Sequence, residues 1–256
     1  MTSARNKSFL DIAAGALAVA LLSSLLAAQT PSSARYDAPI QNLVEHKLAT
    51  KKQFHAVRST VEDGIVTLTG TVDLYQHKLD AAKLARKTAH VQGVQNRIRV
   101  SGAEVADAQL GARLATKLRY VREGYDSTFD YFALSVQGGV VTVEGQDRTG
   151  VGRDEALADI ADMPGVKDVV DNISIAPVSP FDDGLRLRTM RAIYRDPALS
   201  KYALDPGRPI RIIVDNGHVT LYGAVDNNSD KQIAGMRANQ VFGAFTVDNK
   251  LAVGKS

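Results

Sequence analysis

The stretch Asp-Asn-Gly-His-Val-Thr-Leu-Tyr-Gly at residues 215–223 decides the predicted fold, because its pattern occurs twice more in the chain. The other copies are Glu-Asp-Gly-Ile-Val-Thr-Leu-Thr-Gly at 62–70 and Gln-Gly-Gly-Val-Val-Thr-Val-Glu-Gly at 137–145. Two-residue hairpin turns need positive φ, which Asn-Gly, Asp-Gly and Gly-Gly tolerate well. The pattern therefore predicts three antiparallel hairpins. The structural glycines are those at the turns, Gly64, Gly139 and Gly217, and those that close the following run, Gly70, Gly145 and Gly223.

The run after each turn has one apolar face, since the second and fourth residues after the turn glycine are Val or Leu. The turn glycines lie 75 and then 78 residues apart, a spacing that suits small domains better than solenoid repeats. Domains of roughly 65 residues bury little surface on their own. We therefore expect the copies to pack against one another.

Apolar periodicity and helix-stop signals predict the order helix, strand, strand, helix, strand in every copy. In the first copy, the expected elements cover 39–52, 54–61, 65–71, 75–91 with a stop at Gly93, and 94–100. In the second copy, they cover 106–122, 131–137, 140–145, 153–162 and 166–175. In the third copy, they are a helix containing residues 185–194, strands over 210–214 and 219–223, a helix over 229–241 capped by Asn228 or Ser229, and a strand over 245–253. The last strands carry the matching residues Asn96, Asn172 and Asn249.

The N-terminus has the features of an export signal. Arg5 and Lys7 precede an apolar run over 12–26, and small residues with a polar segment follow. Cleavage is expected after Ala28, although an uncleaved membrane anchor within 1–30 is a second interpretation. Cysteine is absent, which excludes disulfides, thiolate nucleophiles and thiolate metal sites.

The net charge of +3 is unevenly distributed. Residues 36–100 carry a net +4, residues 101–176 a net −6 and residues 177–256 a net +3. This pattern favours separate partners, or charge-complementary packing between copies, over a nucleic-acid surface.

The third copy carries the motif Asn-Gly-x-Val-Thr-Leu-x-Gly-x-Val at 216–225 and ends in Gly-Ala-Phe-x-Val-x-Asn-x-Leu-x-Val at 243–253. These motifs, and their weaker counterparts in the first two copies, resemble the BON domain family. The resemblance covers three copies, at 38–101, 106–176 and 182–254. It implies an α+β fold of three tandem αββαβ sandwiches, each with two helices on one face of a three-stranded mixed sheet. It also implies a periplasmic or envelope-associated protein without enzymatic activity, with family roles in phospholipid binding, envelope integrity, osmotic stress, chaperone-like activity and, in one branch, potassium.

The residues themselves indicate no catalytic or cofactor site. The sequence has neither a Gly-x-Ser-x-Gly elbow nor a phosphate-binding glycine loop. No two histidines have the spacing of a helical metal pair, although four of the five lie in the first copy and leave an ion site open. The five are His46, His55, His77, His90 and His218. Carboxylate pairs such as Asp182-Asp183 and Asp154-Glu155 are expected at helix starts, where they compensate the helix dipole.

Two basic stripes are candidates for contact with an anionic lipid surface. Arg188, Arg191 and Arg195 share one face of the third copy's first helix. Lys83, Arg86 and Lys87 form a similar stripe in the first copy. The alternative is that both are solvated outer faces of core-packed helices.

Aromatic residues gather before the hairpin of the second copy, at Tyr120, Tyr125, Phe129, Tyr131 and Phe132. They are expected either to pack in the core or to form a partner surface.

Three functional hypotheses follow. The first is an exported, non-enzymatic protein that binds anionic phospholipid or envelope proteins and contributes to envelope integrity or osmotic stress tolerance. The second is a periplasmic chaperone or adaptor, which requires an exposed apolar groove such as one between copies. The third is a small-ligand or ion-binding protein that uses the histidines of the first copy.

Overall fold

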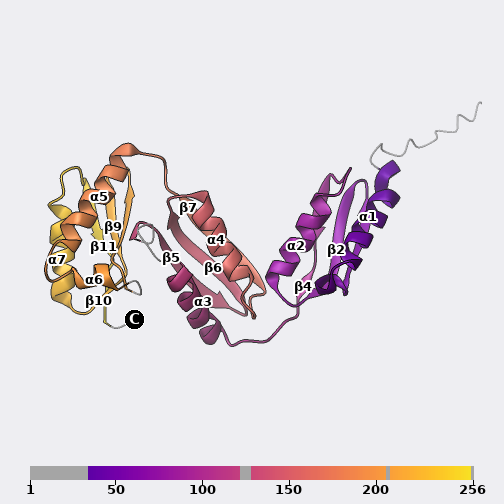
Figure 1. Cartoon of the computed structure of the whole chain (residues 1–256), viewed down its shortest axis with the longest axis horizontal. Coiled ribbons are helices and arrows are strands. Elements are labelled where there is room, and N and C mark those ends of the chain that lie inside the picture. Colours follow the sequence, from indigo (N-terminus) through magenta and orange to yellow (C-terminus); the bar gives the residue numbers. More distant parts are fainter. Residues whose placement is uncertain (1–33, 122–127, 206–207, 255–256) are drawn as a thin grey trace, which may run out of the picture.

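The computed structural model describes residues 34–121, 128–205 and 208–254. Figure 1 shows three α/β units that follow one another along the longest axis of the molecule. The main elements of each unit follow the same order: helix, strand, strand, helix, strand. The export segment expected at residues 1–30 lies outside the described residues. Within the described part, no helix is both long enough and apolar enough to cross a membrane.

The first unit begins with a short 3-10 turn and ends with a strand in two pieces. Its elements are η1 (Ala34–Tyr36), α1 (Asp37–Ala49), η2 (Lys52–Phe54), β1 (Val57–Glu62), β2 (Ile65–Val72), α2 (Tyr75–Arg86), β3 (Gly93–Asn96) and β4 (Arg99–Val100).

The second unit has continuous strands, whereas the third has interrupted strands and one additional helix. The elements of the second unit are α3 (Asp107–Val121), β5 (Tyr131–Gln137), β6 (Val140–Asp147), α4 (Gly150–Ala161) and β7 (Asp168–Ile175). Those of the third unit are α5 (Pro180–Tyr194), α6 (Lys201–Leu204), β8 (Arg211–Asp215), β9 (His218–Tyr222), β10 (Ala224–Val225), α7 (Asn228–Asn239), β11 (Thr246–Asn249) and β12 (Ala252–Val253).

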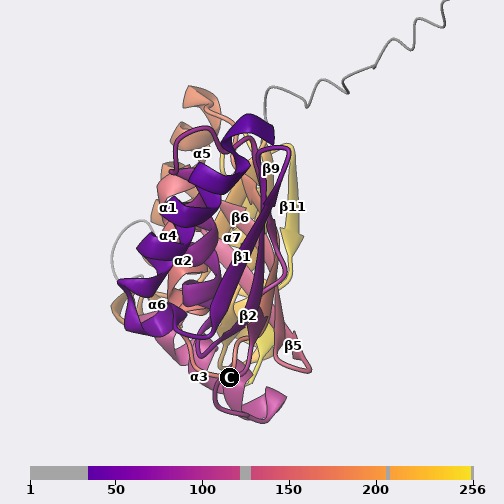
Figure 2. The same cartoon turned by 90° about the vertical axis from the view of Figure 1, so that its right-hand side faces the viewer.

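The main sheet of each unit has the same mixed topology, and in the third unit β10 and β12 pair separately in parallel. The second strand of each hairpin lies in the centre, antiparallel to the first strand and parallel to the last. The helices cover one face of the sheet, as the end-on view shows for α1 and α2 beside β1 and β2 (Figure 2). The predicted α+β class with three repeated units is confirmed.

The three hairpin turns have the predicted geometry. Both central residues have positive φ in each turn, for example 48° at Asn216 and 79° at Gly217. The prediction that a second glycine closes each strand is corrected for two units, because Gly70 and Gly145 lie within β2 and β6 and do not end them. A Cβ atom at Gly70 would lie 2.0 Å from the carbonyl oxygen of Ala56. These glycines therefore allow close approach of the neighbouring strand and do not form turns.

The second helix of the first unit is shorter than predicted. It ends at Arg86 and not at residue 91, and the residue with positive φ after it is His90, at 65°, and not Gly93. The corresponding residues of the other units are Gly165 and Gly243, at 100° and 98°. His90 therefore occupies a position where glycine is the usual residue.

Other predicted boundaries shift for local reasons. The helix α4 begins at Gly150 and not at 153, because the Thr149 side chain accepts a hydrogen bond from the Gly152 amide. In the third unit, Asn227 is the cap, in place of the predicted Asn228 or Ser229. Phe54 lies in η2 and is buried, so the first strand starts at Val57.

The last strand of the second unit is aligned by Asp171 and not by Asn172. Asn96 and Asn249 each accept a bond from the amide two residues later and donate to a carbonyl of the preceding helix, at Lys78 and Lys231. Asp171 accepts the same amide bond from Ile173, and its other oxygen pairs with the Arg153 side chain. A salt bridge thus replaces an amide-to-carbonyl bond in the acidic unit.

Three clusters of buried residues form the cores, one for each unit. Phe129 belongs to the second unit by sequence but is buried in the core of the third. The second and third units also meet where Arg211 donates to the carbonyl of Asp130 and where the rings of Tyr131 and Tyr222 stack at 3.9 Å. The expected packing between copies therefore includes a shared core.

Candidate functional site

The first helix of each unit is fixed to its hairpin turn by one aspartate. Asp182 on α5 accepts hydrogen bonds from the amides of Asn216 and Gly217, at 3.1 and 2.9 Å. The corresponding residues are Asp37 on α1 and Asp107 on α3, each of which accepts from the two amides of its own turn. We call these three residues the turn aspartates. They fix which face of the first helix points away from the sheet.

In the third unit, a buried arginine adds to this constraint on α5. The Arg186 guanidinium donates to the carbonyl of Val214 on β8 at 2.6 Å and pairs with Asp183 at 2.7 Å. Leu185 and Ile193 are fully buried on the same face of the helix. The expected role of Asp182-Asp183 as simple helix-start carboxylates is therefore incomplete, because both carboxylates make specific tertiary or side-chain contacts.

The opposite face of α5 carries the predicted basic stripe. Arg188, Arg191 and Arg195 are all exposed. Among the described residues, none of these three guanidinium groups forms an ion pair. The stripe therefore presents three positive charges to solvent.

An open hollow of about 560 Å³ lies between α5 and the end of α7. Arg188, Arg195 and Arg237 line it, together with Phe242 at its rim. The Arg237 guanidinium pairs with Asp196 at 2.8 Å, and this hydrogen bond lowers the pKa of Asp196 below its ordinary value. Two of the three arginines that line the hollow are thus without a carboxylate partner among the described residues.

Three phenylalanines are exposed at this end of the third unit. Phe242 has 91% of its surface exposed, Phe245 has 69% and Phe181 has 47%. The rings of Phe181 and Phe245 stack with centroids 6.0 Å apart. Basic and aromatic side chains therefore lie together at the α5–α7 end of the unit, and we call this group the basic-aromatic surface.

The stripe of the first unit is also exposed. Lys83, Arg86 and Lys87 lie at the end of α2, where Ala81, Ala82 and Ala85 face the core. The exposed aromatic contact near it is the stack of Tyr36 on His90, and the described residues of this unit form no phenylalanine stack like that of Phe181 and Phe245. The two predicted stripes therefore differ in their surroundings.

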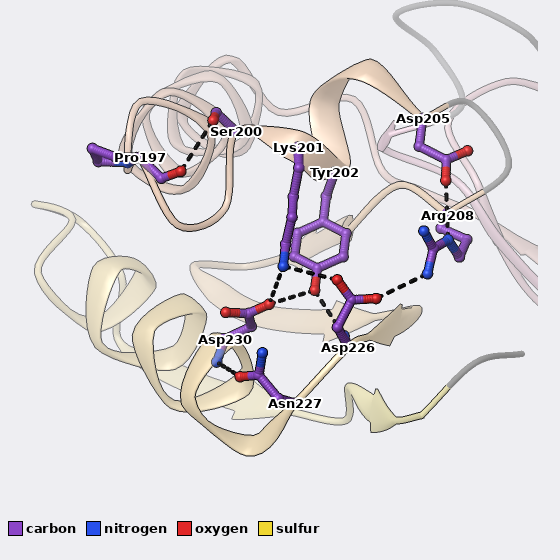
Figure 3. A network of polar contacts seen from close by, with 9 residues as sticks. All are labelled: Pro197, Ser200, Lys201, Tyr202, Asp205, Arg208, Asp226, Asn227 and Asp230. Atoms are coloured by element: carbon purple, nitrogen blue, oxygen red, sulfur yellow. Dashed lines mark hydrogen bonds and ion pairs between the residues drawn. The ribbon is translucent and has the colours of Figure 1, made fainter.

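A polar network holds the segment between α5 and β8 against α7 (Figure 3). Lys201 pairs with Asp226 and Asp230, both at 2.8 Å, and Arg208 pairs with Asp226 at 2.9 Å. The Tyr202 hydroxyl donates to Asp230 at 2.6 Å and accepts from the Asp226 amide at 2.7 Å. Each group has a partner within the fold, so the network stabilises this segment and leaves no vacant ligand position.

A groove of about 670 Å³ separates the second and third units. On one side lie small residues of α3, including Ala108, Gly111 and Ala115, and apolar residues of the edge strand β5. On the other side lie Arg211, Tyr222 and other residues of the third unit. The groove lies between copies, as the chaperone hypothesis requires, but its lining is mixed, because Arg208, Arg211 and Lys250 line it beside the apolar residues.

The aromatic residues of the second copy have different environments. Phe129 is buried, Tyr131 stacks on Tyr222, and Phe132 packs against the second core. Tyr125 and the side chain of Tyr120 lie outside the described residues. The part of the cluster that is described therefore packs between and within units.

The histidines stay dispersed. In the described part of the chain, no three His, Cys, Asp or Glu side chains gather in a way that could hold a metal ion. His90 stacks on Tyr36 at 4.0 Å, and His218 contacts Thr246 at 2.6 Å.

Several important residues were not predicted from the sequence. An aspartate near the start of each first helix was the available signal for the turn aspartates. No sequence signal distinguishes exposed Phe242 from buried Phe129, because exposure depends on tertiary packing.

The fold defines a protein built from three small repeated α+β units. A sequence model of the BON domain family matches residues 36–102, 130–177 and 197–255, more than half of the chain. The chain belongs to the BON domain family. The second and third matched stretches begin after α3 and α5, so they leave out the first helix of each of these units. The domain boundaries 38–101, 106–176 and 182–254 therefore stay predictions.

The solved structures found by comparison are distant. Two are of CdsD, a structural protein of the type III secretion system of Chlamydia trachomatis. They are 16% and 15% identical with TM-scores of 0.22, and cover 83% and 84% of this chain and 90% and 96% of theirs. A third is the periplasmic domain of the inner membrane protein PrgH from S. typhimurium, with 12% identity, a TM-score of 0.18 and coverage of 83% and 100%. A search of curated proteins found no match. Membership of the BON domain family fits an envelope-associated, non-enzymatic protein. This statement rests on the family match and not on the solved structures.

Proposed function

We propose that this protein binds anionic phospholipid at the surface of the cell envelope and thereby contributes to envelope integrity or osmotic stress tolerance. The observation that carries the proposal is the exposed stripe of Arg188, Arg191 and Arg195 on α5. The stripe adjoins exposed phenylalanines, and this combination of cationic and apolar side chains suits the interface of an anionic membrane. Export by the N-terminal segment is part of the proposal.

Electrostatics sets the expected strength of this contact. Each basic residue near an anionic membrane contributes about 1 kcal/mol. Three such residues alone correspond to weak binding, about 10² in the association constant. The binding should weaken as salt is added, because a Debye length near 10 Å at 0.1 M screens exposed charges.

Flotation with vesicles tests the proposal. A chain that begins at Gln29 keeps every described residue and lacks the apolar segment, which would bind membranes by itself. We expect it to float with vesicles that contain phosphatidylglycerol at low salt and to dissociate as salt rises. The variant Arg188→Gln/Arg191→Gln/Arg195→Gln should lose most of this binding. Its matched control, Lys83→Gln/Arg86→Gln/Lys87→Gln, measures the contribution of the first-unit stripe. Absence of flotation at low salt would reject the proposal.

The groove between the second and third units favours a second candidate, a chaperone or adaptor for client proteins. Ala115 is exposed and lines the groove, so Ala115→Phe should fill part of it without changing the charge. If clients bind there, the parent chain suppresses the aggregation of a reduced test protein in the absence of lipid, and the variant does so less well. Equal suppression by both chains would exclude the groove as the client site.

A further inference from the structure

Phe242 has an unusual place in the third unit. Its side chain is almost fully exposed, yet the backbone on both sides of it is fixed. Val241 is buried and its amide bonds to the carbonyl of Ala238, while the amide of Ala244 bonds to the carbonyl of Val241. Gly243 has a φ of 98°, which makes a tight turn directly after Phe242. The ring is therefore presented from an ordered turn.

The same turn is attached to the basic stripe. The Arg188 side chain donates through Nε to the carbonyl of Phe242 at 3.2 Å. Arg188 also lines the open hollow, together with Arg195 and Arg237. An exposed apolar ring thus stands at the rim of a hollow lined by three guanidinium groups and one carboxylate, that of Asp196.

This combination matches the two parts of an anionic phospholipid. Guanidinium groups bind phosphate oxygens through directed hydrogen bonds, and an aromatic ring next to them can enter the apolar layer below the headgroups. The stacked pair Phe181 and Phe245 reaches the same turn, because a Cβ atom on Gly243 would lie 3.3 Å from Phe181 and 3.1 Å from Arg188. The apolar surface next to the hollow is therefore larger than one ring.

We infer that the turn at Phe242 inserts among the acyl chains of an anionic bilayer while the hollow between α5 and α7 binds the phosphate of one lipid headgroup. The inference rests on the proposed lipid binding and deepens it, because it assigns an insertion site and a headgroup site. Binding by charge alone would depend only on the number of arginines. With a headgroup site, the strength of binding also depends on where each arginine lies.

The protein contains no tryptophan, so one introduced tryptophan reports its own environment. In Phe242→Trp, with the chain that begins at Gln29, vesicles containing phosphatidylglycerol should shift the emission to shorter wavelength. Brominated acyl chains should quench that emission by half or more. The control is Leu204→Trp, since Leu204 is 84% exposed and lies on α6, which contacts the opposite end of α7. Its emission should be quenched by less than a tenth.

Two single variants test the headgroup site. Arg195→Gln and Arg191→Gln remove the same charge from the same stripe, but only Arg195 lines the hollow. We expect Arg191→Gln to raise the dissociation constant for phosphatidylglycerol vesicles about fivefold, because one surface charge contributes about 1 kcal/mol. Arg195→Gln should raise it at least threefold more than that, because it also loses a charge-assisted hydrogen bond to the headgroup. Equal effects would overturn the headgroup site.

The outcomes separate this inference from the proposed function. If the parent chain floats with vesicles but the tryptophan at position 242 gives neither shift nor quenching, the insertion is wrong and the lipid binding stands. If a brominated lipid quenches the tryptophan at 204 as strongly as that at 242, the molecule docks by another face and the inference is also overturned. If the parent chain does not bind vesicles at all, both the inference and the lipid-binding proposal fail.

Discussion

At the scale of single residues, the turn aspartates connect a sequence signal to the fold. Each primed turn leaves two amides pointing away from its hairpin, and in each unit one carboxylate accepts both of them. Hydrogen bonds to an ionised acceptor are shorter and stronger than neutral ones. Asp182 is buried as well, so its loss would leave the Gly217 amide without a partner away from water.

Asp182→Ala should therefore lower the free energy of unfolding of the third unit by about 3 kcal/mol. Urea denaturation followed by circular dichroism measures this change. The control is Asp248→Ala, which removes an exposed carboxylate that pairs only with Lys250 in the described contacts. A change below 1 kcal/mol for Asp182→Ala would contradict the role given to the turn aspartates.

His90 allows a test of backbone strain. A residue with a side chain at positive φ is disfavoured by roughly 1 to 2 kcal/mol relative to glycine. Since both His90→Gly and His90→Ala lose the stacking on Tyr36, the difference between them reports the strain, reduced by the larger backbone entropy that glycine loses on folding. We expect His90→Gly to be the more stable variant by about 1 kcal/mol, measured as the shift in thermal midpoint. Equal stability would mean that the turn relaxes in the alanine variant.

The residue scale also shows what the sequence could predict. Glycine marks the turns reliably, because few other residues tolerate a positive φ at two successive positions. The same reasoning misplaced the end of the second helix, since His90 has the positive φ and Gly93 lies in β3. Asn216 has a positive φ that the Asn-Gly signature predicts, whereas the positive φ of His90 depends on its surroundings and has no such signature.

At the scale of elements, the segment between α5 and β8 is the main departure from the repeat. The sequence predicted no element between the helix that contains residues 185–194 and the strand at 210–214, and the structure places α6 there, held by Lys201 and Tyr202 against the start of α7. Burial of one face of α5 in turn directs its arginines outward. The periodicity of α5 was sufficient to predict that stripe, whereas the network depends on contacts between distant segments.

The network makes stability depend on pH. The hydrogen bond from Lys201 holds the pKa of Asp226 below its ordinary value of 3.8, and the bond from Arg237 does the same for Asp196. A carboxylate with a lowered pKa in the folded state stabilises the fold above the ordinary pKa. This contribution is lost as pH falls through the lowered value. We expect the thermal midpoint to fall as pH decreases below about 4. Asp226→Asn should be less stable at pH 7 and show a shallower fall, and an unchanged slope would contradict this assignment.

At the scale of the whole molecule, the second and third units form one body through Phe129. Its ring completes the third core, and Arg211 and the stacked tyrosines fix the units on either side of it. Burial raises the pKa of Tyr194 in this region to about 12, in line with a dry contact. The first and second units meet more lightly. There Tyr75 packs against the second core, and burial near Asp168 raises its pKa to about 12.

Phe129→Ala should destabilise the third unit by about 3 to 5 kcal/mol, because it leaves a cavity in a closed core. Calorimetry should then resolve a separate transition for the third unit at lower temperature, while the second unit keeps its own. The control Phe132→Leu changes an aromatic residue of the second core and leaves the shared core intact. A single, uniformly shifted transition for Phe129→Ala would show that the units are coupled by other contacts.

The repeat predicted the number of units and their internal order, because turn chemistry and helix periodicity are local. It could not assign Phe129 to the third core, since an aromatic residue next to a strand is compatible with either unit. The same limit applied to Phe242, which follows a predicted helix and could have packed under it.

The turn aspartates also bear on how the chain is assembled. The longest of their bonds spans 35 residues, so the first unit can close as soon as its own residues are available, before similar hairpins further along can compete for its helix. The third unit differs, because one side chain of its interior arrives from the preceding unit. The three similar units are therefore expected to fold in order along the chain. The C-terminal unit completes its core only after the preceding unit has supplied that side chain.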